Sequence, residues 1–292
     1  MPDARSWLYV PADRGDRLQG APRRGADALI VDLEDAVAPA GKAAARRTVA
    51  GWLEARPAGG GGPDIWVRLN ADAVGDDVEV LTSQVAGVVL PKAEPALLAS
   101  LDQALGAREQ TLGVPAGQVA VFALVETAVG LRDLHQVATA ARVVHVGLGE
   151  ADLAAALRLR PSPDGAELAP LRLQVVVASA AAGIGAPVGP VSTDFRDLDG
   201  LRRSTEALRR QGFGGRTAIH PAQLPVINDV FTPSAEEVAE ARELVEAFEA
   251  AGSGVITDSA GRMVDVAVVR SAREVLQRAA RHAGAVRAAP GS

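Results

Sequence analysis

The stretch VAVFALVE, residues 119–126, is an apolar run that ends in the carboxylate of Glu126. A continuous apolar run of this length is typical of a strand buried on both faces of a parallel sheet. A carboxylate directly after such a strand is costly to desolvate unless a cation or an arginine meets it. The stretch therefore predicts a buried strand whose end carries a functional or ion-paired acid.

Similar apolar runs recur along the chain, at residues 7–10, 28–31, 65–69, 88–90, 119–125 and 143–146, with weaker runs near Pro187 and Ala218. Intervening segments rich in Ala, Leu, Arg and Glu predict amphipathic helices at 42–55, 95–105, 130–140, 168–182 and 198–211. Alternating strands and helices predict a parallel sheet covered by helices, and eight such units close most naturally into a (β/α)₈ TIM barrel.

The chain continues beyond the eighth strand. We expect a barrel domain over residues 1–232 and a C-terminal helical extension over residues 233–292. The extension is predicted to hold a helix at 234–250, a short hairpin around Asp258 to Gly261, and a final helix at 268–282.

Composition excludes several classes of function. The 292 residues include no cysteine, so disulfides, thiolate metal sites and a thiol nucleophile are ruled out. A net charge of -6 with dispersed arginines lacks the basic footprint of a nucleic-acid binder. The apolar stretches are too short to span a bilayer and the N-terminus does not resemble a secretion signal. We expect a cytoplasmic protein without nucleic-acid or membrane partners.

Polar residues follow nearly every strand candidate. In a barrel these positions share one rim, where barrel enzymes place their chemistry. The rim residues are Arg14, Asp32, Glu34, Asp35, Arg68, Asn70, Lys92, Glu126, Glu150 and Asp152.

Two of these acids are candidate metal ligands. Glu126 and Asp152 follow adjacent strands, and two carboxylates with open positions suit Mg²⁺ better than Zn²⁺. The alternative is that Glu126 pairs with Arg68 and that Asp152 only caps the following helix. The residues alone leave both interpretations open.

The arginines have two interpretations as well. Arg68 presents a planar fork that suits a substrate carboxylate, or it serves as counter-ion to the acids after the second strand. Arg14 and Arg17 are candidates to bind phosphates of a large anionic ligand, or they belong to a solvated helix face.

The chain resembles the citrate lyase beta-subunit-like family, which includes malyl-CoA and citramalyl-CoA lyases, over nearly its whole length. The resemblance rests on nine motifs in the family's order, which are RSWLYVPADRGDR (5–17), GADALIVDLEDAV (25–37), VRLN (67–70), GVVLPKAE (87–94), LVETAVG (124–130), GEADL (149–153), GFGGRTAIHPAQ (212–223), VFTP (230–233) and MVD (263–265).

The resemblance implies Mg²⁺ bound by Glu126 and Asp152, with the acids of the LED motif supporting its water shell and nearby basic groups; Glu34 is the one of these we place among the catalytic residues. Arg68 would bind the carboxylate of a 2-oxo acid, and Lys92, Arg14 and Arg17 would contribute to substrate binding.

The resemblance also implies a role for the extension. Asp265 of the MVD motif would reach the active site of a neighbouring subunit and act as acid and base. The extension would then be a lid exchanged between the protomers of a homotrimer. Without the family, Asp265 reads as a surface aspartate in a turn.

The implied reaction is a retro-Claisen cleavage of a short 3-hydroxyacyl-CoA, such as malyl-CoA or citramalyl-CoA, to acetyl-CoA and a 2-oxo acid of the glyoxylate or pyruvate type, or the reverse condensation. The alternatives are a malyl-CoA thioesterase, a lyase subunit that acts on a citryl group carried by an acyl carrier protein, and a non-catalytic ligand-binding barrel.

Two departures from the family's pattern bear on the site. The loop after the sixth strand reads GEADL where the family has GAEDL, so the acid before Asp152 has moved by one position to Glu150. Arg216 stands where the family commonly carries lysine. Either change bears on substrate choice or on how the thioester arm is held.

Overall fold

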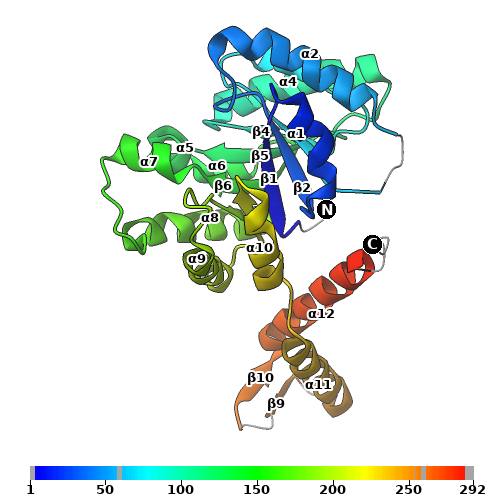
Figure 1. Ribbon diagram of the computed structural model, residues 1–292. Coiled ribbons are helices and arrows are strands. Elements are labelled where there is room, and N and C mark those ends of the chain that lie inside the picture. The colour runs from blue at the N-terminus through cyan, green and yellow to red at the C-terminus, as the bar shows by residue number, and fades with distance from the viewer. Residues whose placement is uncertain (1–3, 58–60, 253, 258–260, 287–292) are drawn as a thin grey trace. The chain divides into compact units, whose positions relative to one another are not determined.

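Eight parallel strands form a closed barrel in chain order, which confirms the predicted (β/α)₈ fold (Figure 1). The computed structural model describes residues 4–57, 61–252, 254–257 and 261–286. The strands are β1 (Ser6–Pro11), β2 (Ala28–Asp32), β3 (Asp64–Arg68), β4 (Gly87–Leu90), β5 (Ala120–Val125), β6 (Val143–Leu148), β7 (Val188–Gly189) and β8 (Gly215–Ala218).

The barrel closes where β1 pairs with β8, with Ser6 opposite Arg216 and Leu8 opposite Ala218. Helices surround these strands because each crossover between parallel strands must return over the outer face. They are α1 (Gly15–Gly20), α2 (Lys42–Glu54), α3 (Val74–Val78), α4 (Pro95–Leu112), α5 (Ala128–Arg132), α6 (Leu134–Ala138), α7 (Glu150–Leu157), α8 (Ala169–Ala182) and α9 (Leu198–Gln211), with short 3₁₀ turns at Ala21–Arg23, Pro39–Gly41, Ala166–Leu168 and Pro221–Gln223.

One predicted helix was wrong in its form. The segment 130–140 was expected to be continuous, but the structure has two short helices, α5 and α6, that meet at Asp133. Asp133 has φ -96° and ψ 21°, outside the helical region, and it ends one helix and begins the next. Helix α4 runs to Leu112, beyond the predicted end at 105, and stops at Gly113 in the left-handed conformation.

Aromatic rings fill the interior of the barrel. Trp7 meets Trp66 edge-on with ring centroids 5.1 Å apart, and Phe122 and His145 lie 5.5 Å and 5.4 Å from the same ring. The indole N–H of Trp7 donates to the carbonyl oxygen of Ala4 at 3.0 Å. Side chains alternate along a strand, so the residue two positions after each of these rings faces the same interior. Those residues lie nearer the carboxyl ends of the strands.

The chain divides into two compact units, one up to Asn228 and one from Asp229 onward. The division falls within α10 (Leu224–Phe231), whereas sequence analysis placed the domain boundary after residue 232. The second unit contains α11 (Ala235–Ala251), an antiparallel pair of β9 (Val255–Thr257) with β10 (Met263–Asp265), and α12 (Val266–Val286). The expected hairpin thus has paired strands, while residues 258–260 of its turn lie outside the described residues.

Two features stabilise the helices of the second unit. Ser234 and Glu237 cap α11 reciprocally, since each side chain accepts the other's backbone N–H, at 3.1 Å and 2.8 Å. Helices α11 and α12 pack against each other. Within the described ranges of both units, no helix combines the length and apolar character that a membrane crossing requires.

The close contact between β4 and the aromatic interior gives a first prediction. A Cβ added at Gly87 would lie closer than 3.0 Å to the Trp66 ring and 2.6 Å from the carbonyl oxygen of Ala120. We expect Gly87→Ala to lower the free energy of unfolding by about 1–3 kcal/mol through overpacking, measured by urea denaturation.

The matched control is Gly51→Ala in α2, where an added Cβ meets nothing within 4 Å. This exposed helical position should gain about 0.5–1 kcal/mol from the higher helix propensity of alanine. Equal stability of the two variants would contradict the tight packing of β4 on Trp66.

Candidate active site

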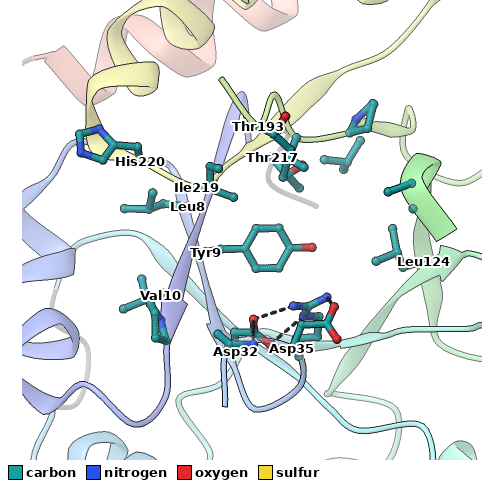
Figure 2. Close-up of a pocket in the computed structure, with 18 of the residues that line it drawn as sticks. Leu8, Tyr9, Val10, Asp32, Asp35, Leu124, Thr193, Thr217, Ile219 and His220 are labelled. Atoms are coloured by element: carbon teal, nitrogen blue, oxygen red, sulfur yellow. Dashed lines mark hydrogen bonds and ion pairs between the residues drawn. The ribbon is translucent and has the colours of Figure 1, made fainter. Parts of the chain in front are cut away.

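A cavity of about 880 Å³ opens among the loops at the carboxyl ends of the strands, where barrel enzymes place their chemistry (Figure 2). Its polar lining includes Asp32, Arg68, Glu126 and Asp152. Its apolar lining includes Leu124, Leu148 and Val188, so the cavity offers charged groups in a partly water-excluding setting.

A buried ion pair joins the ends of β2 and β3. Asp32 and Arg68 are direct register partners across the two strands. Arg68 donates from Nε and Nη2 to the two carboxylate oxygens of Asp32, at 2.8 Å and 2.6 Å. Burial alone would lower the pKa of Arg68, but the carboxylate of Asp32 raises it above its usual value. The guanidinium is therefore a fixed positive charge whose Nε and Nη2 edge is already occupied.

Glu34 links this pair to Lys92. Its Oε2 lies 2.8 Å from Nη1 of Arg68, without the alignment of a hydrogen bond, and its Oε1 accepts from Nζ of Lys92 at 2.7 Å. Burial raises the pKa of Glu34, although the bond from Lys92 and the charge of Arg68 oppose the rise. Lys92 has φ 50°, a strained value for a side-chain-bearing residue, and such strain is often found at functional sites.

Glu126 follows β5 and is only 5% exposed. Its Oε2 accepts the backbone N–H of Lys92 at 2.9 Å, while the rest of the carboxylate borders the cavity. Asp152 lies in the first turn of α7 and lines the same cavity. The structure thus brings the two acids that follow β5 and β6 to one site.

Neither acid has a cationic partner among the residues that the structure describes. Arg68 engages Asp32, Glu34 and Asp35 rather than Glu126. Helix α7 has no side-chain cap, so Asp152 does not fill the capping role considered as its alternative. Burial raises the pKa of Glu126 to about 7, and the charges of Glu34 and Asp152 add to the rise, while the Lys92 N–H opposes it.

These two carboxylates fit a hard divalent cation. Two uncompensated oxygen donors that face a cavity provide part of a Mg²⁺ coordination shell and leave positions for water and ligand. In the described part of the chain, no three His, Asp or Glu side chains gather into a complete metal site. The donor set therefore suits an open site rather than a protein-enclosed one.

Of the three basic residues predicted to bind substrate besides Arg68, only Arg17 is among the lining residues of the cavity. Arg14 is exposed, pairs with Asp16 at 3.3 Å, and is not among the described lining residues. Lys92 is also outside that lining and its Nζ is bound to Glu34.

Asp265 belongs to the second unit of the chain. Its Oδ1 accepts the backbone N–H groups of Ala267 and Val268, at 2.9 Å and 3.1 Å, so it caps the start of α12. The contacts of this aspartate are local, and its catalytic role stays a prediction.

The shifted acid of the GEADL loop has a partner of its own. Glu150 accepts from Nε and Nη2 of Arg172 in α8, at 2.5 Å and 2.8 Å, and both side chains are largely buried. Arg216 does not line the cavity, and its guanidinium instead donates to oxygens of Pro190, Ser204 and Thr205. Burial lowers the pKa of Arg216 to about 10.

Sequence reasoning missed two features of this site. Sequence analysis offered Arg68 as counter-ion to the acids after the second strand, but it did not single out Asp32 or the bidentate geometry, which the register of β2 with β3 would have indicated. Tyr9 was given no role, yet it lines the cavity two residues after Trp7 on the same strand. The alternation of side chains along β1 was the signal that could have found it.

The raised pKa of Glu126 gives a prediction about stability and pH. The pKa of Glu126 is about 7 in the folded state and 4.5 in the unfolded state. The contribution of the protonated carboxyl to folding stability is therefore fully present below pH 4.5 and is lost as the pH rises through 7. In buffer with EDTA at pH 8, we expect the free energy of unfolding of Glu126→Gln to be higher than that of wild type by up to about 3 kcal/mol. Urea denaturation measures both values.

That advantage should shrink toward zero as pH falls to 4.5. Glu54→Gln, an exposed acid at the end of α2, is the matched control and should show little pH-dependent difference. A pH-independent gap between Glu126→Gln and wild type would contradict the costly ionisation of Glu126.

Comparison with known proteins agrees with this geometry. The citrate lyase subunit beta of Leuconostoc mesenteroides subsp. cremoris is 32% identical over 282 residues, which cover 94% of this chain and 92% of that protein. A (3S)-malyl-CoA thioesterase of Cereibacter sphaeroides (strain ATCC 17025 / ATH 2.4.3) is 35% identical over 278 residues, 94% of each chain.

A solved structure is similar over nearly the same span. CitE from Mycobacterium tuberculosis, in complex with magnesium, acetoacetate and coenzyme A, matches with a TM-score of 0.76 and 32% identity, covering 94% of this chain and 98% of that one. The HpcH/HpaI aldolase/citrate lyase family matches residues 5–221, which include the whole barrel up to β8. The chain therefore belongs to the HpcH/HpaI aldolase/citrate lyase family.

Proposed function

We propose that this chain is a Mg²⁺-dependent carbon–carbon lyase that converts a short 3-hydroxyacyl-CoA, such as malyl-CoA or citramalyl-CoA, to acetyl-CoA and a 2-oxo acid, or catalyses the reverse condensation. One observation carries the proposal: the Glu126 and Asp152 carboxylates line one cavity beside Arg68 and lack cationic partners among the described residues. The magnesium and coenzyme A bound by the Mycobacterium tuberculosis relative support it.

Glu126 and Asp152 would hold the cation from two adjacent loops. When bound, Mg²⁺ supplies Lewis-acid polarisation of the ligand's oxygen. Glu126 is held by the Lys92 N–H, and Asp152 by its place in the first turn of α7, so both donors are positioned before the ligand arrives.

Arg68 would bind the carboxylate of the oxo-acid half through Nη1, because Nε and Nη2 are taken by Asp32. The ligand would displace the Asp35 carboxylate, which accepts from Nη1 at 3.3 Å. Glu34 would act on the reaction by holding both Arg68 and Lys92 in place. Arg17, at the cavity, would meet the phosphates of coenzyme A, and Arg14 and Lys92 would add positive charge at its approach.

Cleavage of the bond between the hydroxyl-bearing carbon and the thioester's α-carbon leaves its electron pair on the thioester enolate. The hydroxyl proton leaves to water, and the hydroxyl oxygen becomes the carbonyl of the 2-oxo acid. Asp265 would donate a proton to the enolate carbon to give acetyl-CoA, or remove it in the condensation direction. Arg68 and the two metal-binding acids would fix the ligand, so positioning supplies part of the rate.

A second candidate is hydrolysis of the thioester, which the 35% identity to a (3S)-malyl-CoA thioesterase favours. The similarity to a citrate lyase subunit beta equally supports a substrate carried on an acyl carrier protein. A non-catalytic barrel is the weakest candidate, because the two unpartnered acids would then destabilise the fold without a benefit.

Product analysis tests the proposal. Malyl-, citramalyl- and methylmalyl-CoA are incubated with the protein and Mg²⁺, and the products are identified by mass spectrometry. We expect acetyl-CoA or its homologue together with a 2-oxo acid, and loss of activity in EDTA, because the cation polarises the reacting oxygen.

Glu126→Ala should abolish the Mg²⁺-dependent turnover, whereas Glu54→Ala, on the exposed end of α2, should match wild type. Free coenzyme A thiol with an intact hydroxy acid would establish the thioesterase instead. Undiminished cleavage in EDTA would remove the metal from the mechanism.

We further propose that residues 233–292 form a lid exchanged between the protomers of a homotrimer, so that Asp265 serves a neighbour's cavity. Co-expressed Glu126→Ala and Asp265→Asn chains test this. In a trimer that holds both chains, one of the three sites combines the intact halves, so the mixed trimers should regain about a third of wild-type activity.

The mixed oligomer is isolated with two affinity tags, and its lyase rate is compared with each parent variant. Asp265→Asn alone should also stop proton exchange at the acetyl methyl group while retaining Mg²⁺ affinity. A mixed oligomer no more active than its parents would show that Asp265 does not act across protomers.

A further inference from the structure

Tyr9 occupies a central place in the cavity. It lies on β1, two residues beyond Trp7, and its ring packs on the aromatic interior of the barrel. The guanidinium carbon of Arg68 lies 4.9 Å from the centre of the Tyr9 ring, a cation–π distance. Figure 2 shows the ring across the middle of the cavity, with its hydroxyl directed toward the side where Leu124 lies.

The direction of the hydroxyl brings it to the reacting side of the cavity. Leu124 faces the cavity from β5, and Glu126 is two residues further on, so alternation places both on the same face. The Asp152 loop follows the neighbouring strand β6. The hydroxyl therefore points toward the side of the cavity that carries the two unpartnered acids.

The hydroxyl has no hydrogen-bond partner among the residues that the structure describes. By contrast, the Thr217 hydroxyl in the same lining already donates to the carbonyl oxygen of Gly189 at 3.0 Å. Burial raises the pKa of Tyr9, opposed by Arg68 and reinforced by Asp32 and Glu126, so the phenol stays protonated. Tyr9 is thus a neutral donor available to whatever fills the cavity.

Packing alone does not account for this hydroxyl. A phenylalanine ring would cover the aromatic interior, as Phe122 does against Trp7, and would lie equally close to Arg68. The charged groups around the ring already include one cation and several acids. A neutral O–H adds the ability to bind a ligand oxygen without changing the charge of the site.

We propose that the Tyr9 hydroxyl donates a hydrogen bond to the oxygen on the carbon next to the ligand's carboxylate, which is the 3-hydroxyl of the thioester and the 2-oxo oxygen of the product. This inference rests on the proposed function. A ligand whose carboxylate binds Arg68 would lie beside the Tyr9 ring, 4.9 Å from the guanidinium carbon, and its adjacent oxygen would be the acceptor nearest to that carboxylate. Tyr9 would then select 2-oxo and 2-hydroxy acids over simple carboxylic acids of the same length.

Binding to the full-length protein in Mg²⁺ buffer tests this with pyruvate and with propionate, which has the same carbon chain without the 2-oxo oxygen. Isothermal titration calorimetry compares wild type with Tyr9→Phe, and glyoxylate with acetate forms a second pair. We expect Tyr9→Phe to weaken pyruvate binding by about tenfold and to change propionate binding by less than about twofold.

Tyr9 is the only tyrosine of the chain, which allows a second measurement on the unaltered protein. Labelling tyrosine with ¹³C at Cζ should give one NMR resonance, because the label enters a single site. That resonance should move on addition of pyruvate and should move much less with propionate.

Thr193→Val removes another hydroxyl from the cavity lining and is the matched control. It should leave the ratio of pyruvate to propionate affinity unchanged. Equal pyruvate affinity of wild type and Tyr9→Phe, with the same resonance shift for both acids, would overturn the assignment of Tyr9. Failure of wild type to bind either oxo acid would overturn the proposed function itself, and this inference with it.

Discussion

The site is organised around one buried interaction, the bidentate pair between Asp32 and Arg68 across β2 and β3. Removing either partner would leave an uncompensated charge in the barrel, which typically costs about 3–5 kcal/mol. The pair also fixes the loop after β2, because the Asp32 oxygens accept the backbone N–H groups of Glu34 and Ala36. The position of the guanidinium and of the next acid thus follows from a single contact.

The Asp32–Arg68 pair is connected to the other acids of the site through a series of contacts. Glu34 contacts Arg68 on one side and Lys92 on the other, and the backbone of Lys92 holds Glu126. Two hydrogen bonds hold Lys92 at its strained φ of 50°, one from its side-chain Nζ to Glu34 and one from its backbone N–H to Glu126. Asp152 stands outside this chain of contacts and, among the described residues, has no charged partner within ion-pair distance. Of the two acids proposed to hold the cation, Glu126 is thus fixed by the network and Asp152 is not.

Much of the fold could be predicted because its signals are local. Apolar runs and helical periodicity locate the strands, and even the two-residue β7 leaves a weak trace near Pro187. The break between α5 and α6 at Asp133 was not predicted, because no proline or glycine marks it in the sequence. The Asp32–Arg68 bond and the exposure of the Tyr9 hydroxyl depend on packing between distant segments, which periodicity does not encode. The rim acids and the possible counter-ion role of Arg68 were visible in sequence, but the choice of partner and the geometry of each pair were not.

The bond between Glu150 and Arg172 has a consequence for the charge balance of the cavity. Of the acids lining it in the described part of the chain, Asp32, Asp35 and Glu150 each contact a guanidinium. The two that remain carry together the charge that a single divalent ion offsets. Without Arg172, Glu150 would add one more negative charge to the cavity and weaken the binding of carboxylates and phosphates. Because Arg172 matches its charge, the shifted acid neither adds to the uncompensated charge of the cavity nor offers another ligand to the proposed cation.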